Sequence, residues 1–294
     1  MSVRTLIARG AARLARARVF FGHGTDNAWD EAAALVLHAL RLPARGAAAL
    51  YRRRVGAAAQ RRVRQLLTRR IAERIPAAYL TGGASFAGVR LKVDARALIP
   101  RSPLAEVIER RFAPWIEASG VRRVLDVGTG CGCIAIACAK YLPRARVDAL
   151  DISDAALELA GENVRRHRLA RRVRLLKSDH FRALRGATYD IIVANPPYVG
   201  RAELAGLPPE YRHEPRVALA AGVHGLDSVR IILRKAARHL RPGGLLIVEV
   251  GNTEHAVRRA YPRLPFVWLQ FAHGGGGVFL LTREQLQGRR RRRG

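Results

Sequence analysis

The chain has few cysteines and no long apolar segment. Its three cysteines, Cys131, Cys133 and Cys138, fall within eight positions of one another. A structural zinc site needs about four ligands, usually including paired cysteines with distant partners. Because this spacing is absent and the nine histidines follow no metal-ligand pattern, we expect no metal site. No stretch approaches the roughly 20 apolar residues that span a bilayer, so we expect no membrane association.

A secretory signal is also absent, because residues 1–18 contain no continuous apolar segment. The stretch is rich in arginine and lacks acids, as mitochondrial transit peptides are. However, the apolar residues from Val3 to Val19 fall at near-helical spacing and run into the folded sequence, which favours a helix of the mature protein. Reduced thiols without a secretory signal are typical of a cytoplasmic protein.

Acidic residues are scarce, with 23 Asp and Glu against 53 Lys and Arg, and the net charge is +30. Only four of the basic residues are lysines. The abundance of arginine together with alanine indicates a compositional bias of the source genome. Whatever its origin, such a surface attracts polyanions with salt-sensitive affinity. Contact with RNA is therefore compatible with the sequence, but the charge alone does not indicate a nucleic-acid substrate.

The 294 residues suffice for one large α/β domain and a smaller one. Residues 1–82 are predicted to be helical, since Asp30–Leu40 and Gln60–Ile75 carry apolar residues on one helical face. At Ala84–Asp94 the spacing of the apolar residues changes from that of a helix to that of strands, which predicts a short hairpin. We therefore assign residues 1–82 to a helical domain and residues 83–97 to a hairpin linker.

From about Val121 apolar strands alternate with helices. The strand candidates are Val121–Asp126, Arg146–Asp151, Val173–Lys177, Tyr189–Ala194 and Gly243–Val250, and helices are expected at Ala155–Arg166 and Ser228–His239. This alternation is typical of a parallel sheet covered on both faces. Two later segments, Phe266–Phe271 and Gly277–Thr282, are joined by glycines and predict a closing antiparallel pair. The prediction is an α/β, Rossmann-like domain of seven strands over residues 98–287, followed by a solvated arginine-rich tail, 288–294.

A glycine-rich loop follows the first of these strands. The predicted cofactor residues here are Asp126, Gly128, Thr129, Gly130, Cys131 and Gly132. The spacing G-x-G-x-G, with an acid two positions earlier, differs from the dinucleotide fingerprint G-x-G-x-x-G. Asp151 ends the next strand, where a carboxylate can accept hydrogen bonds from ribose hydroxyls. Because S-adenosylmethionine carries no pyrophosphate and has a zwitterionic end, an acid near that end favours it over NAD.

The tetrapeptide Asn195-Pro196-Pro197-Tyr198 follows the strand Tyr189–Ala194. An amide nitrogen is a poor nucleophile, so an enzyme that methylates it must hold it in line and accept its two hydrogens. The Asn195 side-chain carbonyl and the Pro196 backbone carbonyl are suitable acceptors. The two prolines restrict the backbone, and Tyr198 can pack on the flat amide. These four residues are the predicted catalytic residues.

The whole chain resembles the N5-glutamine methyltransferases of the HemK/Prm group, and within it the branch acting on large-subunit ribosomal protein L-three. The matching segments are Phe21–Asn27, Trp29–Ala32, Ile75–Pro76, Tyr79–Thr81, Leu98–Pro103 and Glu210–Pro215. The release-factor branch usually continues its Ile-Pro-Arg segment with Pro-Glu-Thr-Glu, whereas Ser102-Pro103-Leu104 stands here. This difference favours the ribosomal-protein branch.

The resemblance implies a class I methyltransferase fold with S-adenosylmethionine bound by Gly128–Gly132 and Asp151. It also implies that Asp179 and His180 lie beside the adenine, and that Asn195 contacts the cofactor as well as the glutamine. His180 stands where release-factor enzymes often have tryptophan. The helical domain would select the substrate, ribosomal protein L-three, free or in a ribosome assembly intermediate with rRNA nearby.

Three alternatives remain open. The Asn-Pro-Pro-Tyr sequence also occurs in enzymes that methylate adenine N6 in nucleic acids, although no separate base-extracting domain is visible. A release factor is a second possible substrate. The third alternative is a basic RNA- or ribosome-binding factor without catalysis. The segment Val199–Asp227, rich in proline and glycine, is expected to be a loop that serves as a lid or substrate groove.

Overall fold

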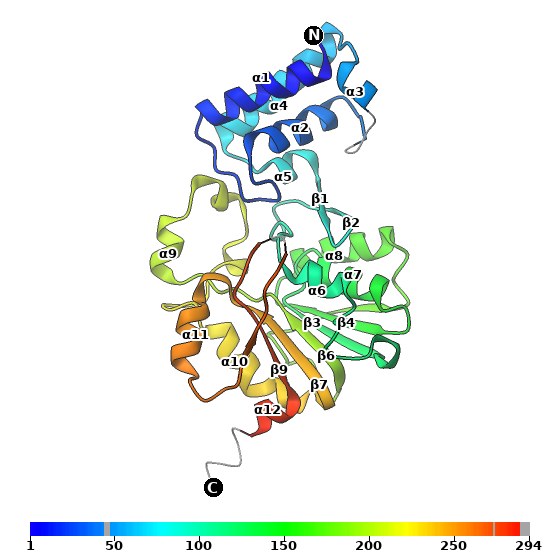
Figure 1. The fold of residues 1–294 in the computed structure, drawn as a ribbon, viewed down its shortest axis with the longest axis vertical. Helices are drawn as coiled ribbons and strands as arrows, with labels where there is room; N and C mark the ends of the chain where they lie inside the picture. The colour runs from blue at the N-terminus through cyan, green and yellow to red at the C-terminus, as the bar shows by residue number, and fades with distance from the viewer. Residues whose placement is uncertain (44–47, 273, 289–294) are drawn as a thin grey trace.

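A helical unit lies at one end of the molecule and a sheet-containing unit at the other (Figure 1). The computed structural model describes residues 1–43, 48–272 and 274–288. The helices of the first unit are α1 (Val3–Arg16), α2 (Ala28–Ala39), α3 (Ala48–Arg52), α4 (Ala57–Glu73) and α5 (Ala77–Thr81). Of the expected arginine-rich tail, residues 289–294 lie outside the described residues.

The helical unit forms because its helices are capped and amphipathic. The Ser2 side chain accepts a hydrogen bond from the Thr5 backbone amide at the start of α1, and Asn27 does the same for Asp30 at the start of α2. The apolar faces of α1, α2 and α4 meet in a separate core that includes Leu35. This unit therefore has its own hydrophobic core.

A hairpin of β1 (Gly83–Phe86) and β2 (Val89–Lys92) connects the two units. Asn163 of the sheet unit accepts a hydrogen bond from the Lys92 amide, at 2.8 Å, and donates one to the Cys131 carbonyl, at 2.9 Å. A single buried amide thus ties the hairpin to the glycine-rich loop.

The second unit contains a mostly parallel sheet in the order β5-β4-β3-β6-β7-β9-β8. Its strands are β3 (Arg123–Val127), β4 (Arg146–Asp151), β5 (Val173–Lys177), β6 (Tyr189–Ala194), β7 (Leu240–Glu249), β8 (Val267–Trp268) and β9 (Val278–Thr282). The predicted seven-stranded α/β fold is confirmed. The closing segments pair antiparallel as expected, and β9 lies between β7 and β8.

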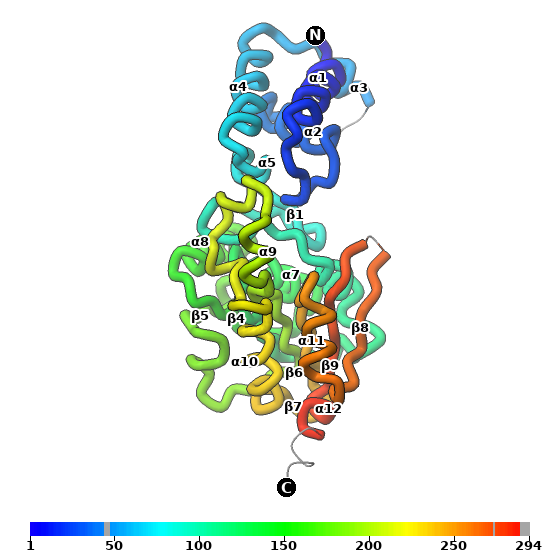
Figure 2. The backbone as a smooth tube through the Cα atoms, turned by 90° about the vertical axis from the view of Figure 1, so that its left-hand side faces the viewer, coloured from blue at the N-terminus to red at the C-terminus, as the bar shows by residue number. Residues whose placement is uncertain are grey.

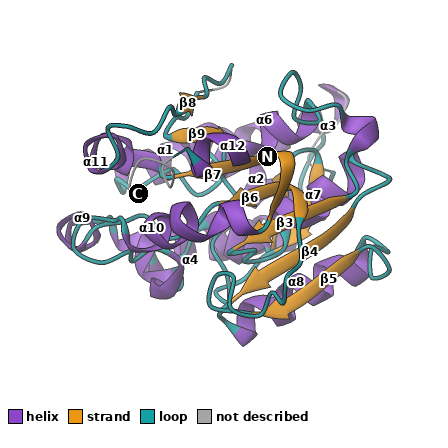
Figure 3. Ribbon diagram, turned by 90° about the horizontal axis from the view of Figure 1, so that it is seen from below, coloured by secondary structure: helices purple, strands orange, loops and turns teal. Residues whose placement is uncertain are grey.

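Helices cover both faces of this sheet (Figure 3). One face packs against α6 (Leu104–Glu109), α7 (Cys133–Tyr141) and α8 (Asp154–Arg166). The other packs against α10 (Asp227–Lys235), α11 (Glu254–Ala260) and α12 (Arg283–Gln287). Among the described residues, no helix combines the length and apolar character needed to cross a membrane.

The expectation that Val199–Asp227 is loop throughout is wrong in part. It contains α9 (Arg201–Gly206) and the 3₁₀ helices η2 (Pro209–His213) and η3 (Arg216–Ala218). The stretch that forms α9 has no proline and contains good helix formers, and Pro209 begins η2 at a position where its missing N–H costs nothing. The prolines therefore divide the segment into short turns of helix.

Candidate active site

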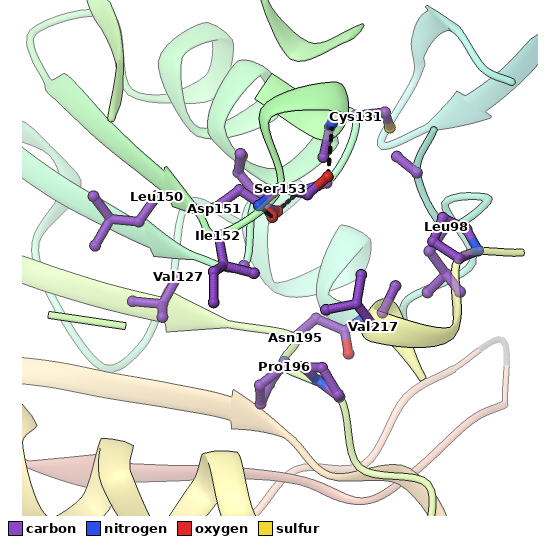
Figure 4. Close-up of a pocket in the computed structure, with 18 of the residues that line it drawn as sticks. Leu98, Val127, Cys131, Leu150, Asp151, Ile152, Ser153, Asn195, Pro196 and Val217 are labelled. Atoms are coloured by element: carbon purple, nitrogen blue, oxygen red, sulfur yellow. Dashed lines mark hydrogen bonds between the residues drawn. The ribbon is translucent and has the colours of Figure 1, made fainter. Parts of the chain in front are cut away.

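One cavity of about 260 Å³ lies where the carboxyl ends of β3, β4 and β6 meet (Figure 4). These strands are neighbours in the sheet, in the order β4-β3-β6. Their following loops therefore share one edge, which is where open α/β sheets bind ligands. The predicted site residues that line the cavity are Gly128, Thr129, Gly130, Cys131, Asp151, Asp179, His180, Asn195, Pro196 and Pro197. The predicted cofactor loop and the predicted amide clamp thus face the same space.

The glycine-rich loop turns sharply at the cavity. Gly128 and Gly130 have φ of +79° and +55°, a region that strains other residues. The amides of Gly128 and Thr129 both donate to the Leu150 carbonyl, at 2.9 and 2.8 Å. The turn is therefore fixed to the end of β4, and its backbone is exposed to a ligand without a side chain in between.

Asp151 lies at the other side of this turn, at the end of β4. Its carboxylate accepts the Gly130 amide at 2.8 Å and the Ser153 amide at 2.9 Å, each on a different oxygen (Figure 4). Burial raises the pKa of this carboxyl. Each carboxylate oxygen can accept more than one hydrogen bond, so both retain capacity for a pair of ribose hydroxyls.

Asp126 and Gly132 do not line the cavity. Asp126 is fully buried beneath the loop, where it accepts the Thr129 hydroxyl at 2.6 Å and the Ala135 amide at 3.1 Å. Burial raises its pKa to about 7. Its Oδ1 atom has no partner among the described residues. Asp126 supports the loop from below, and Gly132 caps α7.

The walls of the cavity include apolar side chains that the sequence analysis missed. Ile152, directly after Asp151, is 52% exposed, and Val217 from η3 is 53% exposed across the cavity (Figure 4). Leu98 contributes a third apolar surface. Exposed apolar groups facing a cavity suit a flat aromatic ligand such as adenine. The position of Ile152 was available from sequence, because it follows the strand-ending acid.

Asp179 and His180 lie together at the cavity. His180 Nδ1 is 2.7 Å from Asp179 Oδ1, and Arg182 contacts the other oxygen at 3.2 Å. The hydrogen bond to His180 lowers the pKa of Asp179. Both residues line the cavity, and the Asp179 carboxylate is already engaged by two neighbours.

The clamp residues follow β6 directly. Asn195, Pro196 and Pro197 line the cavity. Within the described part of the chain, neither the Asn195 side chain nor the Pro196 carbonyl has a hydrogen-bond partner. Two acceptors are thus free on adjacent residues, at the cavity that also contains the glycine-rich loop. This arrangement matches the two hydrogens of a planar NH₂ group.

Tyr198 does not line the cavity but packs behind the clamp. Its hydroxyl donates to Glu249 Oε1 at 3.2 Å, and Ser102 Oγ donates to Glu249 Oε2. Burial at the end of β7 raises the pKa of Glu249 to about 6. The sequence analysis did not identify Glu249, although an acid at the carboxyl end of an apolar strand was the same signal that identified Asp151.

We expect Gly251→Ala to impair methyl transfer by displacing Tyr198. A Cβ atom at Gly251 would lie 2.6 Å from the Tyr198 ring. Gly243→Ala is a matched control, because it has a similar positive φ but no atom within 4 Å. Turnover should fall about tenfold or more in the first variant and remain near wild type in the second. Equal turnover in the two variants would show that the Tyr198 position is unimportant.

Comparisons with known proteins identify similar sequences over the whole chain. Residues 5–82 match the family model described as the PrmC N-terminal domain, and residues 110–205 match the methyltransferase small domain. A ribosomal protein uL3 glutamine methyltransferase from Bordetella pertussis is 47% identical over 97% of this chain and 96% of that protein. One from Xanthomonas campestris is 50% identical over 96% of this chain and 91% of that protein.

A solved structure shares the fold at low sequence identity. The catalytic domain of hMettl16, in complex with MAT2A 3'UTR hairpin 6, superposes with a TM-score of 0.52. It is 17% identical, and the match covers 77% of this chain and 81% of that one. At this identity the likeness concerns the fold alone.

Proposed function

Because this chain belongs to the family of ribosomal protein uL3 glutamine methyltransferases, we propose that it methylates the side-chain amide nitrogen of a glutamine in ribosomal protein uL3. It is an S-adenosylmethionine-dependent protein glutamine methyltransferase. The observation that carries the proposal is the single cavity lined by both the glycine-rich loop and the free acceptors of Asn195 and Pro196. We place the reaction in the cytoplasm, because its substrate is a ribosomal protein.

The cavity fits S-adenosylmethionine in its chemistry. Asp151 has acceptor capacity for ribose hydroxyls, Ile152 offers an apolar surface to adenine, and the turn at Gly128–Gly130 leaves backbone exposed. When bound, the cofactor supplies an electrophilic methyl group on a sulfonium.

The clamp acts on the substrate amide. The Asn195 side-chain carbonyl and the Pro196 carbonyl accept the two amide hydrogens, which fixes the plane of the amide so that one face of its nitrogen is presented for methyl transfer. The prolines fix φ, and Tyr198 is held behind them by Glu249. Methyl transfer forms an N–C bond, breaks the S–C bond and moves the positive charge to the amide nitrogen, which then releases one of its two protons to solvent past its clamp acceptor. Because this charged nitrogen is strongly acidic, positioning can supply much of the rate without a strong base.

The proposal is tested by transfer of labelled methyl groups to unmethylated uL3, a release factor and nucleic acid, side by side. We expect label on uL3, at a glutamine, and none when Asn195 is replaced by alanine. Label on the release factor or on adenine would confirm methyl transfer but contradict the assignment of uL3 as the substrate. Binding of S-adenosylmethionine without transfer to any acceptor would instead favour the non-catalytic binding factor.

We further propose that the enzyme contacts rRNA, as it would if its substrate were an assembly intermediate. A hollow on the sheet unit is lined by Arg123, Arg146, Arg165, Arg171, Arg172 and Arg174. Asp148 neutralises part of this charge through two ion pairs. Arg146, Arg165 and Arg171 are exposed and have no ion-pair partner within the described ranges. Such a group of free guanidinium ions suits phosphate contacts.

Changing Arg146, Arg165 and Arg171 together to glutamine should weaken rRNA binding. The slope of the logarithm of the binding constant against the logarithm of the salt concentration should fall in magnitude by about 2 to 3, one for each lost phosphate contact. Methylation of free uL3 should not change. The matched control replaces Arg230, Arg234 and Arg259, which are exposed on α10 and α11 across the sheet. Equal weakening by the two triple variants, measured by filter binding at several salt concentrations, would attribute RNA affinity to overall charge.

A further inference from the structure

A segment between the clamp and α10 connects the cavity to the helical unit. We call residues 208–221 the strap. Its far end returns to the clamp, where the Val199 amide donates to the Leu219 carbonyl and the Ala221 amide donates to the Val199 carbonyl, both at 2.9 Å. Side chains of the strap, including Val217, line the cavity. The position of the strap therefore sets part of the cavity wall.

The middle of the strap is fixed to the opposite cavity wall by Glu214. Its carboxylate receives two hydrogen bonds from Arg101, at 2.6 and 2.7 Å, and one from the Ile99 amide at 3.0 Å. Burial opposes ionisation of Glu214, yet the Arg101 and His23 contacts lower its pKa to about 2. A buried, two-pronged ion pair of this kind has a defined geometry.

The near end of the strap is fixed to the helical unit by Glu210. Its Oε1 atom receives hydrogen bonds from Arg70 Nη1 at 3.1 Å and from the Phe20 amide at 3.0 Å. His213 adds a contact of 2.8 Å between its Nε2 atom and the Glu73 carbonyl at the end of α4. Figure 2 shows this part of the chain reaching up to α4 and α5.

Arg70 is the centre of this contact and is fully buried. Besides Glu210, it donates to Glu31 Oε1 at 2.7 Å and to the Phe20 carbonyl at 2.8 Å, using a different nitrogen for each. A lysine has a single nitrogen and cannot reproduce this fork. Since a buried charge without its partner is unfavourable, the strap and the helical unit are held together in one arrangement.

We propose that Arg70 is a positioning residue for methyl transfer: acting through Glu210, it holds the strap and so maintains the cavity wall beside the amide clamp. The helical unit then has two separable roles, one in selecting the protein substrate and one in shaping the catalytic cavity. This inference rests on the proposed glutamine methylation for its kinetic consequence. The physical link between Arg70 and the strap does not depend on the reaction.

Two glutamate variants separate this role from simple stability. Glu210→Gln weakens the link to the strap by removing the negative charge that pairs with Arg70, and it leaves the Arg70–Glu31 pair intact. Glu31→Gln is the matched control, because it removes an equally buried carboxylate from the same arginine but does not touch the strap. Hydrogen exchange is measured at the amides of residues 218–221 in both variants. We expect these amides to exchange faster in Glu210→Gln only. This measurement needs no substrate.

Turnover is then measured with full-length uL3 and with short uL3 peptides that each carry one glutamine. Glu210→Gln should lower kcat about tenfold on both, while Glu31→Gln stays within about twofold of wild type. A rise in KM for full-length uL3 alone, or equal exchange and kcat in the two variants, would overturn the proposal. Absence of methylation by the wild type would count against the proposed function instead, and the exchange result would still decide whether Glu210 holds the strap.

Discussion

Replacing Asn195 by alanine is expected to lower kcat for glutamine methylation by roughly a hundred- to thousandfold while leaving the protein folded and able to bind S-adenosylmethionine. The magnitude is that of removing one preorganised hydrogen-bonding group from a catalytic site. Within the described residues the Asn195 side chain has no hydrogen bond, so its removal leaves no protein group unpaired. The fold should therefore tolerate the change.

The measurement compares single-turnover transfer to uL3 with cofactor affinity from calorimetry. Asn252→Ala is the control, because Asn252 is an exposed asparagine whose side chain bonds Glu203 and no other residue in the part of the chain that the structure describes. Comparable losses of turnover and cofactor affinity in Asn195→Ala would assign this residue to the cofactor rather than to the substrate amide. Turnover near wild type would remove it from the mechanism.

Replacing Asp151 by alanine is expected to weaken S-adenosylmethionine binding by about tenfold to a hundredfold. A hydrogen bond to a charged acceptor contributes about 1.5–3 kcal/mol, and the variant also frees the Gly130 and Ser153 amides that shape the turn. Asp154→Asn is the control, since Asp154 is an exposed aspartate that pairs with Lys177 outside the cavity. Calorimetric titration of both variants gives the comparison, and equal affinities would show that Asp151 does not bind the ribose.

The buried Asp151 carboxyl also predicts that the affinity for S-adenosylmethionine depends on pH. Burial raises the pKa of Asp151, so it takes up a proton at a higher pH than an ordinary aspartate does. Protonation removes acceptor capacity, and cofactor affinity should therefore fall as the pH is lowered through this raised pKa. The affinity of Asp151→Ala for S-adenosylmethionine should not fall in this way. A parallel fall in the variant would show that another group titrates.

Local patterns in the sequence were sufficient to predict where the strands, the hairpin and the two loops lie along the chain. Each depends on residues close together in the chain: alternating apolar residues in a strand, glycines in a turn, two prolines after an asparagine. The resemblance to the family, and no local pattern, implied that Asn195 contacts the cofactor bound by Asp151.

The tertiary structure decided which of those residues reach the cavity and what supports them. Asp126, predicted beside the cofactor, lies beneath the loop, because its carboxylate is used to hold Thr129 and Ala135. Short helical turns formed where the sequence indicated only a loop. Glu249, which holds Tyr198, is 51 positions away from it.

The fold class and the family could thus be predicted from residues close together in the chain. Only the tertiary structure placed Arg70 against Glu210, 140 positions along the chain, and Arg101 against Glu214. The physical reason is that strand and turn preferences act between neighbours, whereas the pairing of buried charges depends on how whole helices and loops pack.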